Sequence, residues 1–179
     1  MSEKRGTERR LTTRGAATRR RIVAAAADLA MLRAAAALQA ERVLAAHGPL
    51  LEALDSLAAM RSWRDAVLAL NRRTGCPLGA LVYQLPRSAR GARTAVGDGL
   101  EIWRRRIEEG LVRMQARGEL APGAAPADIA LAVLSAVQGG LLLSRSAKSD
   151  RPLALAFDMA LAHVAAQVRS RRAASPSKA

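Results

Sequence analysis

Apolar residues recur at helical spacing along most of the chain, in stretches separated by Gly and Pro. The first stretch, residues 16–47, contains neither Gly nor Pro and is dominated by alanine, the strongest helix former. Its apolar positions, three or four residues apart as on one helix face, include Ile22, Ala25, Leu29, Leu32 and Ala36. The pattern predicts one continuous helix over about residues 18–46, which Gly48 and Pro49 are expected to break or kink.

Further helical stretches follow in the middle of the chain. Leucines at helical spacing predict a helix over residues 50–60, and Ser62 is expected to cap a separate helix that ends near Asn71. A long helix is predicted over about residues 90–117, with Gly118 as its left-handed cap. Its apolar stripe consists of Leu100, Trp103, Ile107, Leu111 and Met114.

The last two predicted helices, residues 126–144 and 152–172, are broadly apolar. In a chain of this size, one layer of neighbouring helices does not cover such surfaces. We therefore expect a homodimer in which both helices pack against their copies as a four-helix bundle. A monomeric core of closely packed, alanine-rich helices is the alternative. The side chains expected at the dimer interface are Leu134, Leu141, Phe157, Leu161 and Val164.

Composition agrees with an all-α protein of one main domain. Half of the 179 residues are hydrophobic, whereas aromatic residues make up 2%. β-Sandwiches and barrels are rich in Val, Ile, Thr and aromatic residues, which argues against them here. One cysteine excludes cysteine-based zinc sites, and the two histidines are far apart, so neither a metal nor a cofactor is expected. No phosphate loop, Ser-His-acid set or paired carboxylates stand out, so we do not expect an enzyme.

Positive charge is concentrated at both ends of the chain. The formal net charge is +14; residues 1–33 hold nine basic and three acidic residues, and residues 169–179 hold four and none. Such an excess implies an anionic partner, most often nucleic acid. No apolar signal segment opens the chain, and the longest uncharged apolar stretch, residues 129–144, is shorter than the roughly 20 residues of a membrane span. A cytoplasmic protein without a membrane partner is expected.

Motifs in two parts of the chain resemble those of TetR-family transcriptional regulators. Residues 18–29 are similar to the first helix of that family, where a Thr-Arg…Ile-Leu/Val-x-Ala-Ala pattern opens the DNA-binding domain. The Gly-Cys-Pro-Leu-Gly motif at residues 75–79, the Trp103 helix and the Gln-Gly-Gly-Leu motif at residues 138–141 resemble the C-terminal domain of the LmrA/YxaF-like subgroup. The resemblance covers about residues 18–168 and implies an all-α, TetR-like helical bundle.

One element of the family pattern is missing. In the family, a turn, a second helix and a recognition helix ending in Tyr-x-x-Phe follow the first helix; here residues 29–33 run directly into residues 34–46, which resemble the family's fourth helix. A helix-turn-helix reads DNA by placing its second helix in the major groove, so specific DNA binding is not expected of this chain. The domains expected are a flexible basic arm (residues 1–15), a remnant of the DNA-binding domain (16–40), a ligand-binding and dimerisation domain (41–172) and a tail (173–179).

The resemblance also implies a ligand pocket, bounded by the apolar residues 80–85, the Trp103 helix and the Gln138 helix. Such cavities are mostly apolar with a few polar anchors. Ordinary core packing explains each lining residue taken singly, and Cys76 also fits an inert buried thiol. The expected pocket residues are Met60, Trp63, Cys76, Leu81, Tyr83, Trp103, Met114 and Gln138.

Two functions therefore remain open. The first is a TetR-type regulator, of repressor lineage, that senses a small apolar ligand as a homodimer. Its weak contacts to DNA phosphates would come from Arg14, Thr18, Arg19, Arg20 and Arg21. The alternative is a module deficient in DNA binding that sequesters ligand or forms heterodimers with a full-length relative. A nonspecific nucleic-acid protein is a third, weaker interpretation.

Overall fold

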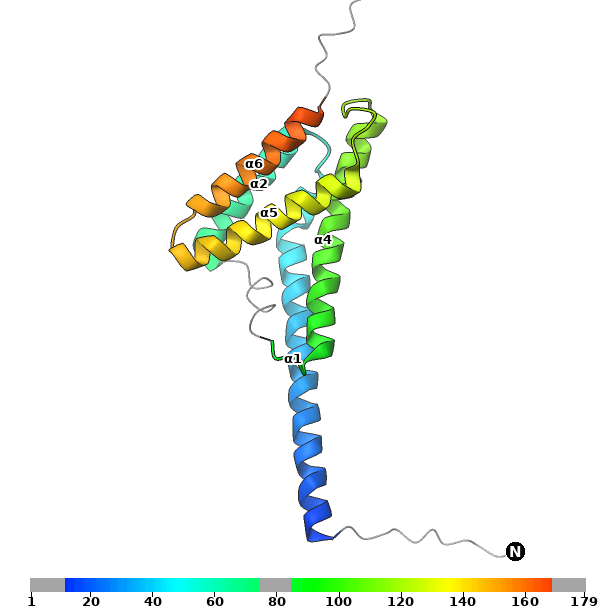
Figure 1. Ribbon diagram of the computed structural model, residues 1–179, viewed down its shortest axis with the longest axis vertical. Helices are drawn as coiled ribbons and strands as arrows, with labels where there is room; N and C mark the ends of the chain where they lie inside the picture. Colours follow the sequence, from blue (N-terminus) through cyan, green and yellow to red (C-terminus); the bar gives the residue numbers. More distant parts are fainter. Residues whose placement is uncertain (1–11, 75–84, 169–179) are drawn as a thin grey trace, which may run out of the picture.

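The computed structural model describes residues 12–74 and 85–168, and the regular elements of these residues are all α-helices apart from one isolated β-bridge between Leu120 and Val168. This confirms the fold class predicted from periodicity and composition. The helices, labelled in Figure 1, are α1 (Thr13–Glu52), α2 (Leu57–Thr74), α4 (Arg90–Ala116), α5 (Pro126–Ala147) and α6 (Arg151–Gln167).

The first helix, α1, is a single helix of 40 residues. The predicted continuous helix over residues 18–46 is therefore confirmed, and it extends further at both ends. Of the break or kink predicted at Gly48 and Pro49, the break is wrong: the helix runs through Pro49, whose carbonyl accepts a hydrogen bond from the amide of Ala53. Buried Leu51 holds this last turn in the core although Pro49 cannot donate a backbone hydrogen bond.

The connection after α1 differs from the prediction. No separate helix covers residues 50–60, because α1 ends at Glu52 and α2 begins at Leu57. The serine that caps α2 is Ser56, whose hydroxyl accepts from the amide of Ala59 at 3.2 Å, and not Ser62. Ser62 lies inside α2, where its hydroxyl donates to the carbonyl of Ala58.

The predicted long helix, α4, ends with the expected glycine cap. Gly118 has a φ of +69°, and its amide donates to the carbonyl of Gln115. The amide of Glu119 donates to the carbonyl of Met114. This pair of bonds is the Schellman arrangement, which satisfies the last carbonyls of a helix.

Two helix pairs build the body of the molecule (Figure 1). The upper part of α1 packs along α4 and runs in the same direction, with Gly91 beside Arg33 and Gly110 against Leu54. The second pair, α5 and α6, forms a hairpin that lies across the first, with α2 against α6. A Cβ atom at Gly140 would come within 2.8 Å of the Cα atom of Leu153, so this glycine permits the close approach of α5 and α6.

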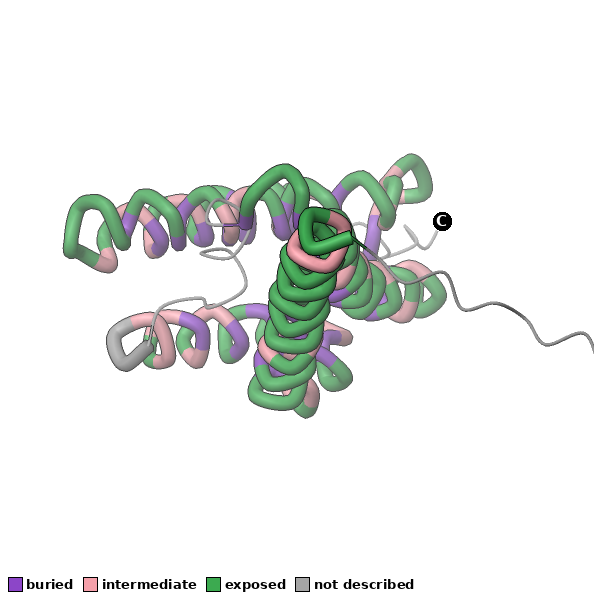
Figure 2. The backbone as a smooth tube through the Cα atoms, turned by 90° about the horizontal axis from the view of Figure 1, so that it is seen from below, coloured by how far each residue is buried: buried purple, intermediate pink, exposed green. Residues whose placement is uncertain are grey.

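The lower part of α1 projects from the body. The residues of α1 that are buried begin at Ala36, and none of the described residues before it is buried. Figure 2 looks along α1 from its N-terminal end, and the nearer turns are exposed almost throughout. This projecting segment (residues 12–35) includes large apolar side chains that solvent reaches, among them Ile22 and Met31, each 63% exposed.

Candidate functional site

Four rings from four helices meet in the core. His47 of α1 stacks on Trp103 of α4, with ring centroids 5.2 Å apart and planes inclined by 24°. Trp63 of α2 meets Trp103 edge-on at 6.2 Å and Phe157 of α6 edge-on at 5.0 Å. All four side chains are at most 4% exposed. We call these residues the aromatic cluster; offset-stacked and edge-to-face geometries of this kind are the favoured ones for aromatic pairs.

The aromatic cluster contains polar atoms without partners. Nδ1 of His47 and Nε1 of both Trp63 and Trp103 are buried and make no hydrogen bond in the structure, and Nε2 of Gln138 on α5 shares this condition. Buried polar groups in proteins are nearly always hydrogen-bonded, so three unpaired ring nitrogens in one cluster call for an explanation. Burial also lowers the pKa of His47 below its ordinary value, because the charged imidazolium would lose its hydration. The ring is therefore neutral at pH 7.

The structure brings together part of the predicted ligand pocket. Trp63 and Trp103 are in direct ring contact, and Met60 and Met114 are also buried in the core. Gln138 is half-buried. Three further predicted residues lie outside the described part of the chain, namely Cys76, Leu81 and Tyr83.

Sequence reasoning missed two members of the aromatic cluster as pocket residues. His47 was considered only as a metal ligand, although it continues a stripe of buried positions on α1 formed by Ala36, Ala40, Val43, His47 and Leu51. That stripe was the signal that could have found it. Phe157 was assigned to a dimer interface, whereas it is fully buried against Trp63 within the chain.

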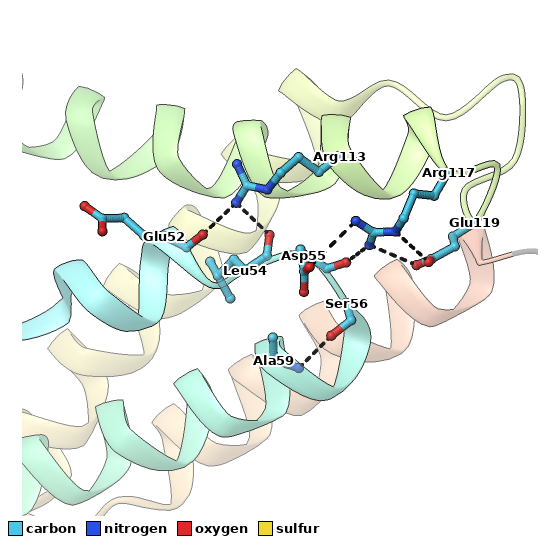
Figure 3. Close-up of polar contacts among 8 residues, drawn as sticks. All are labelled: Glu52, Leu54, Asp55, Ser56, Ala59, Arg113, Arg117 and Glu119. Atoms are coloured by element: carbon cyan, nitrogen blue, oxygen red, sulfur yellow. Dashed lines mark hydrogen bonds and ion pairs between the residues drawn. The ribbon is translucent and has the colours of Figure 1, made fainter.

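Arg113 of α4 and Arg117, which follows the last residue of α4, bind the backbone at and after the C-terminal end of α1 (Figure 3). Nη2 of Arg113 donates to the carbonyls of Glu52 at 2.9 Å and Leu54 at 3.4 Å. Arg117 donates to the carbonyl of Asp55 and forms an ion pair with Glu119, Nε to Oε1, at 2.8 Å. The bond to Glu52 satisfies a carbonyl that the end of α1 leaves free, and the bonds to Leu54 and Asp55 hold the connection between α1 and α2 against α4.

The side chains predicted for a dimer interface lie inside the single chain. All five are at most 7% exposed, because their faces of α5 and α6 are covered by the chain's other helices: Leu134, Leu141, Phe157, Leu161 and Val164. The same two helices expose a different apolar set on their outer sides. It consists of Leu131, Leu142 and Leu143 on α5 and Leu155 and Met159 on α6.

The basic residues predicted to contact DNA all lie on the projecting segment. Arg14, Thr18, Arg19, Arg20 and Arg21 are exposed in the first turns of α1. From Thr13 to Glu52 the backbone is one unbroken helix, so these forty residues contain no helix-turn-helix. Within the part of the chain that the structure describes, no second helix packs beside these first turns of α1.

A surface hollow of about 380 Å³ lies between α2 and α6. Three of its charged lining residues are paired with one another: Arg64 donates to Asp158 through Nε at 2.6 Å and Nη2 at 3.0 Å, and to Asp65 through Nη1 at 2.8 Å. Because both carboxylates neutralise this arginine, the aromatic cluster is the stronger candidate site.

Two helices are long and apolar enough to cross a membrane by length and composition alone, α1 and α5. Much of α5 is buried as a core helix of the bundle, whereas the apolar window of α1 is 6% buried. Among the described residues, no group of three His, Cys, Asp or Glu side chains is placed to hold a metal ion.

Comparison with known proteins agrees with this architecture. No curated protein matches the sequence. Among solved structures, a TetR transcriptional regulator from Chloroflexus aurantiacus J-10-FL aligns with a TM-score of 0.62 at 22% identity, over 76% of this chain and 71% of that one. A regulatory protein TetR from Rhodobacter sphaeroides aligns with a TM-score of 0.56 at 25% identity, over 75% and 72% of the two chains.

Residues 51–159 match the C-terminal domain of the LmrA/YxaF-like transcriptional regulators. Because this match spans more than half of the chain, the protein belongs to the LmrA/YxaF-like branch of the TetR family of transcriptional regulators.

Proposed function

We propose that this regulator senses a small, largely apolar ligand at the aromatic cluster. The three unpaired ring nitrogens carry the proposal, because leaving a buried donor unsatisfied costs about 1–3 kcal/mol. A ligand with an apolar ring and a hydrogen-bond acceptor would cover the rings and accept from an indole N–H group. The proposed lining also includes Met60, Met114 and Gln138, together with Cys76, Leu81 and Tyr83.

Tryptophan fluorescence tests this site directly, because both tryptophans of the chain belong to the aromatic cluster. Acetophenone serves as the probe, and α-methylstyrene, in which a CH₂ group replaces the carbonyl oxygen, serves as the matched control. We expect both to change the emission saturably and acetophenone to bind more tightly. In Trp63→Phe and Trp103→Phe, at least one of the two should lose this preference while it still binds α-methylstyrene.

Two outcomes would contradict the ligand proposal. If neither probe changes the emission saturably, the cluster is only a packed core. If both probes bind equally to the wild-type chain, the indole N–H groups are not its polar anchors. His163→Phe, at an exposed histidine of α6, is the control for a ring substitution outside the cluster.

We further propose that residues 41–172 form a ligand-binding and dimerisation domain, with two copies in contact through the outer sides of α5 and α6. The exposed apolar set on these helices supports this, since Met159 is 75% and Leu143 59% exposed. Large exposed apolar patches on soluble proteins commonly mark interfaces. Met159→Arg should halve the mass measured by light scattering, whereas Val112→Arg, at an exposed apolar residue of α4, should leave it unchanged. An unchanged mass for Met159→Arg would contradict this interface.

For DNA we propose nonspecific binding in the cytoplasm by a chain of repressor lineage. The unbroken helix from Thr13 to Glu52 favours the second candidate function, a module deficient in specific DNA binding that retains ligand binding or pairs with a full-length relative. Phosphate contacts by the basic residues of the projecting segment give affinity without sequence information.

A titration against the DNA upstream of its own gene, with unrelated DNA as competitor, separates these functions. We expect a Kd of roughly 10⁻⁴–10⁻⁶ M at physiological salt, independent of sequence and weakened steeply by added salt. Replacing Arg19, Arg20 and Arg21 by Ala should lower the salt slope by up to about three units. Retention of one fragment about a thousandfold more tightly would show that the chain does read DNA.

A further inference from the structure

The stripe by which α1 packs on α4 continues into the projecting segment. Its buried part ends at Ala36, close to where α4 begins at Arg90, and Gly91 of α4 lies beside Arg33. Continuing toward the N-terminus by three or four residues along the same face gives Leu32, Leu29, Ala25, Ile22 and Thr18. All five are exposed, with Ile22 at 63% and Leu29 and Leu32 at 37% and 36%. The helix thus carries an apolar seam beyond the point at which its own partner helix starts.

We propose that the projecting segment of a second copy covers this seam, with the two helices antiparallel. The seam residues are spaced alternately three and four apart, as in a coiled coil. Ile22 and Leu29 occupy one core position of the heptad, and Thr18, Ala25 and Leu32 occupy the other. At 1.5 Å per residue, the 24 residues of the segment form a rod about 36 Å long. Thr12 of one copy then lies opposite Ala35 of the other, and Ile22 opposite Ala25.

The charges flanking the seam favour this register. Arg21 and Asp28 lie on the same edge of the seam, one heptad apart, so antiparallel pairing sets Arg21 of each copy beside Asp28 of the other. The remaining basic residues at the edges meet uncharged ones: Arg14 faces Ala35, Arg19 faces Ala26, and Arg33 faces Thr12. Two ion pairs form and no like charges meet.

The parallel orientation fits the fold less well, although it would also set Asp28 beside Arg33 of the other copy. In a parallel pair, both copies would bring the N-terminal end of α4 to the same face of α1 just above Arg33, where Gly91 already lies. Parallel pairing would also set Arg14 beside Arg19 of the other copy. An antiparallel pair leaves the two bodies at opposite ends of the rod, so neither α4 blocks the seam.

A second copy also fits this segment better than a membrane does. Asp28 and Arg33 interrupt the apolar stretch after Arg21, and each costs about 2.5–3.5 kcal/mol near the centre of a bilayer. In the paired helix both residues lie at the edge of the seam and stay hydrated. The many alanines let two helices approach closely, because they bring only a methyl group to the contact.

The test measures the mass of the full chain by sedimentation equilibrium. In the Met159→Arg background, in which the proposed contact through α5 and α6 is removed, Leu29→Asp should reduce a dimer to a monomer, whereas Ala27→Asp, on the opposite side of the same turn, should leave the dimer unchanged. Both positions are exposed in the single chain, so neither substitution disturbs the core.

Arg21→Asp and Asp28→Arg should each weaken the association about tenfold, and the combined variant should restore it, because the two ion pairs are re-formed with exchanged signs. Arg20→Asp, which makes the same charge change away from the seam, is the control.

A cysteine experiment fixes the orientation. In chains with Cys76→Ser, a mixture of Thr18→Cys and Leu29→Cys variants should form a disulfide between unlike chains, and neither variant should link to itself. Met159→Arg is included as a background in which the proposed contact through α5 and α6 is removed. The link and the effect of Leu29→Asp should persist in it, which separates this pairing from the proposed dimer.

Three results would overturn the proposal. Equal masses for Leu29→Asp, Ala27→Asp and the wild type would show that the seam is unpaired. Disulfides between like chains would show a parallel pair. Binding of the wild type to phosphatidylglycerol vesicles, lost in Leu29→Asp without any change in mass, would assign the seam to a membrane instead.

Discussion

The two halves of α1 share a sequence pattern and differ in what surrounds them. Above Ala36, positions three or four residues apart are buried against the body; below it, equivalent positions such as Ile22 and Leu29 are exposed. Alanine has the highest helix propensity, and the packed upper half supplies the nucleus that an isolated helix lacks. Local sequence therefore determines where a helix forms, whereas neighbouring segments determine which of its faces is buried.

Family resemblance explains why the lower half has no neighbours. In TetR-type regulators, two further helices follow the first one and pack against it; in this sequence residues 29–33 continue directly into the next family helix. The resemblance therefore implies a helix fused across the gap; in the structure, its apolar face continues beyond the part of α1 that is buried.

The largest contrast should come from truncating a side chain of α4 that packs on the upper half of α1 and a side chain of the lower half itself. Trp103→Ala removes a buried ring that stacks on His47 and should lower the free energy of unfolding by about 3–5 kcal/mol. Met31→Ala removes an exposed side chain of the projecting segment and should change it by less than about 0.5 kcal/mol. Urea denaturation followed by circular dichroism measures both. Similar losses for the two variants would mean that the lower half is as tightly packed as the upper.

Glycines on α4 sharpen the comparison on the packed side. A Cβ atom at Gly110 would lie 1.8 Å from the carbonyl oxygen of Leu54, so Gly110→Ala must separate α4 from the end of α1 and should cost about 1–3 kcal/mol. Gly97 lies on the same helix, and a Cβ atom there would have no neighbouring atom within 4 Å. Gly97→Ala should therefore stabilise the protein by about 0.5–1 kcal/mol. Thermal unfolding of the two variants should shift in opposite directions; a shift in the same direction would contradict this packing.

Much of the fold was predictable, because helix spacing and breakers are local properties. The long first helix, α4 with its cap at Gly118, and the two last helices follow from such patterns. The choice between Ser56 and Ser62 as the cap of α2 does not, since both precede apolar residues. Tertiary bonds decide it: Arg113 and Arg117 bind the carbonyls of Glu52, at the end of α1, and of Leu54 and Asp55, which lie between α1 and α2.

The candidate site was predictable only in part. Trp63 and Trp103 were identified because large apolar residues on helix stripes converge in a core. Phe157 belongs to a stripe as well, but a stripe does not reveal whether its own chain or another copy covers it. The same ambiguity applies to Leu134 and Leu161, which are buried within the chain.

Acid should weaken the packed half through His47. Its pKa is lowered by burial, so below the unfolded-state value of about 6.5 the unfolded chain takes up a proton that the folded chain resists. Stability is therefore fully present above pH 6.5 and falls by at most about 1.4 kcal/mol per pH unit as the pH drops toward the folded-state pKa. His47→Phe keeps a ring against Trp103 and should flatten the profile between pH 7 and pH 5. An equally steep profile in that variant would assign the dependence to other groups.

The smallest effects concern the two ends of α1. Arg113→Ala removes the hydrogen bonds to Glu52 and Leu54 at the packed end and should lower the free energy of unfolding by about 1 kcal/mol. At the other end, the Thr12 hydroxyl accepts from the amide of Gly15 at 3.2 Å. Thr12→Ala removes a cap of similar intrinsic worth, but the projecting turns open without unfolding the body, so global stability should not change. Hydrogen exchange distinguishes the two: Thr12→Ala should speed exchange only in the first turns of α1, whereas Arg113→Ala should lower protection throughout the body. If Thr12→Ala destabilised the body as much as Arg113→Ala does, the two halves of α1 would unfold as one cooperative unit, and the contrast between them would be one of exposure alone.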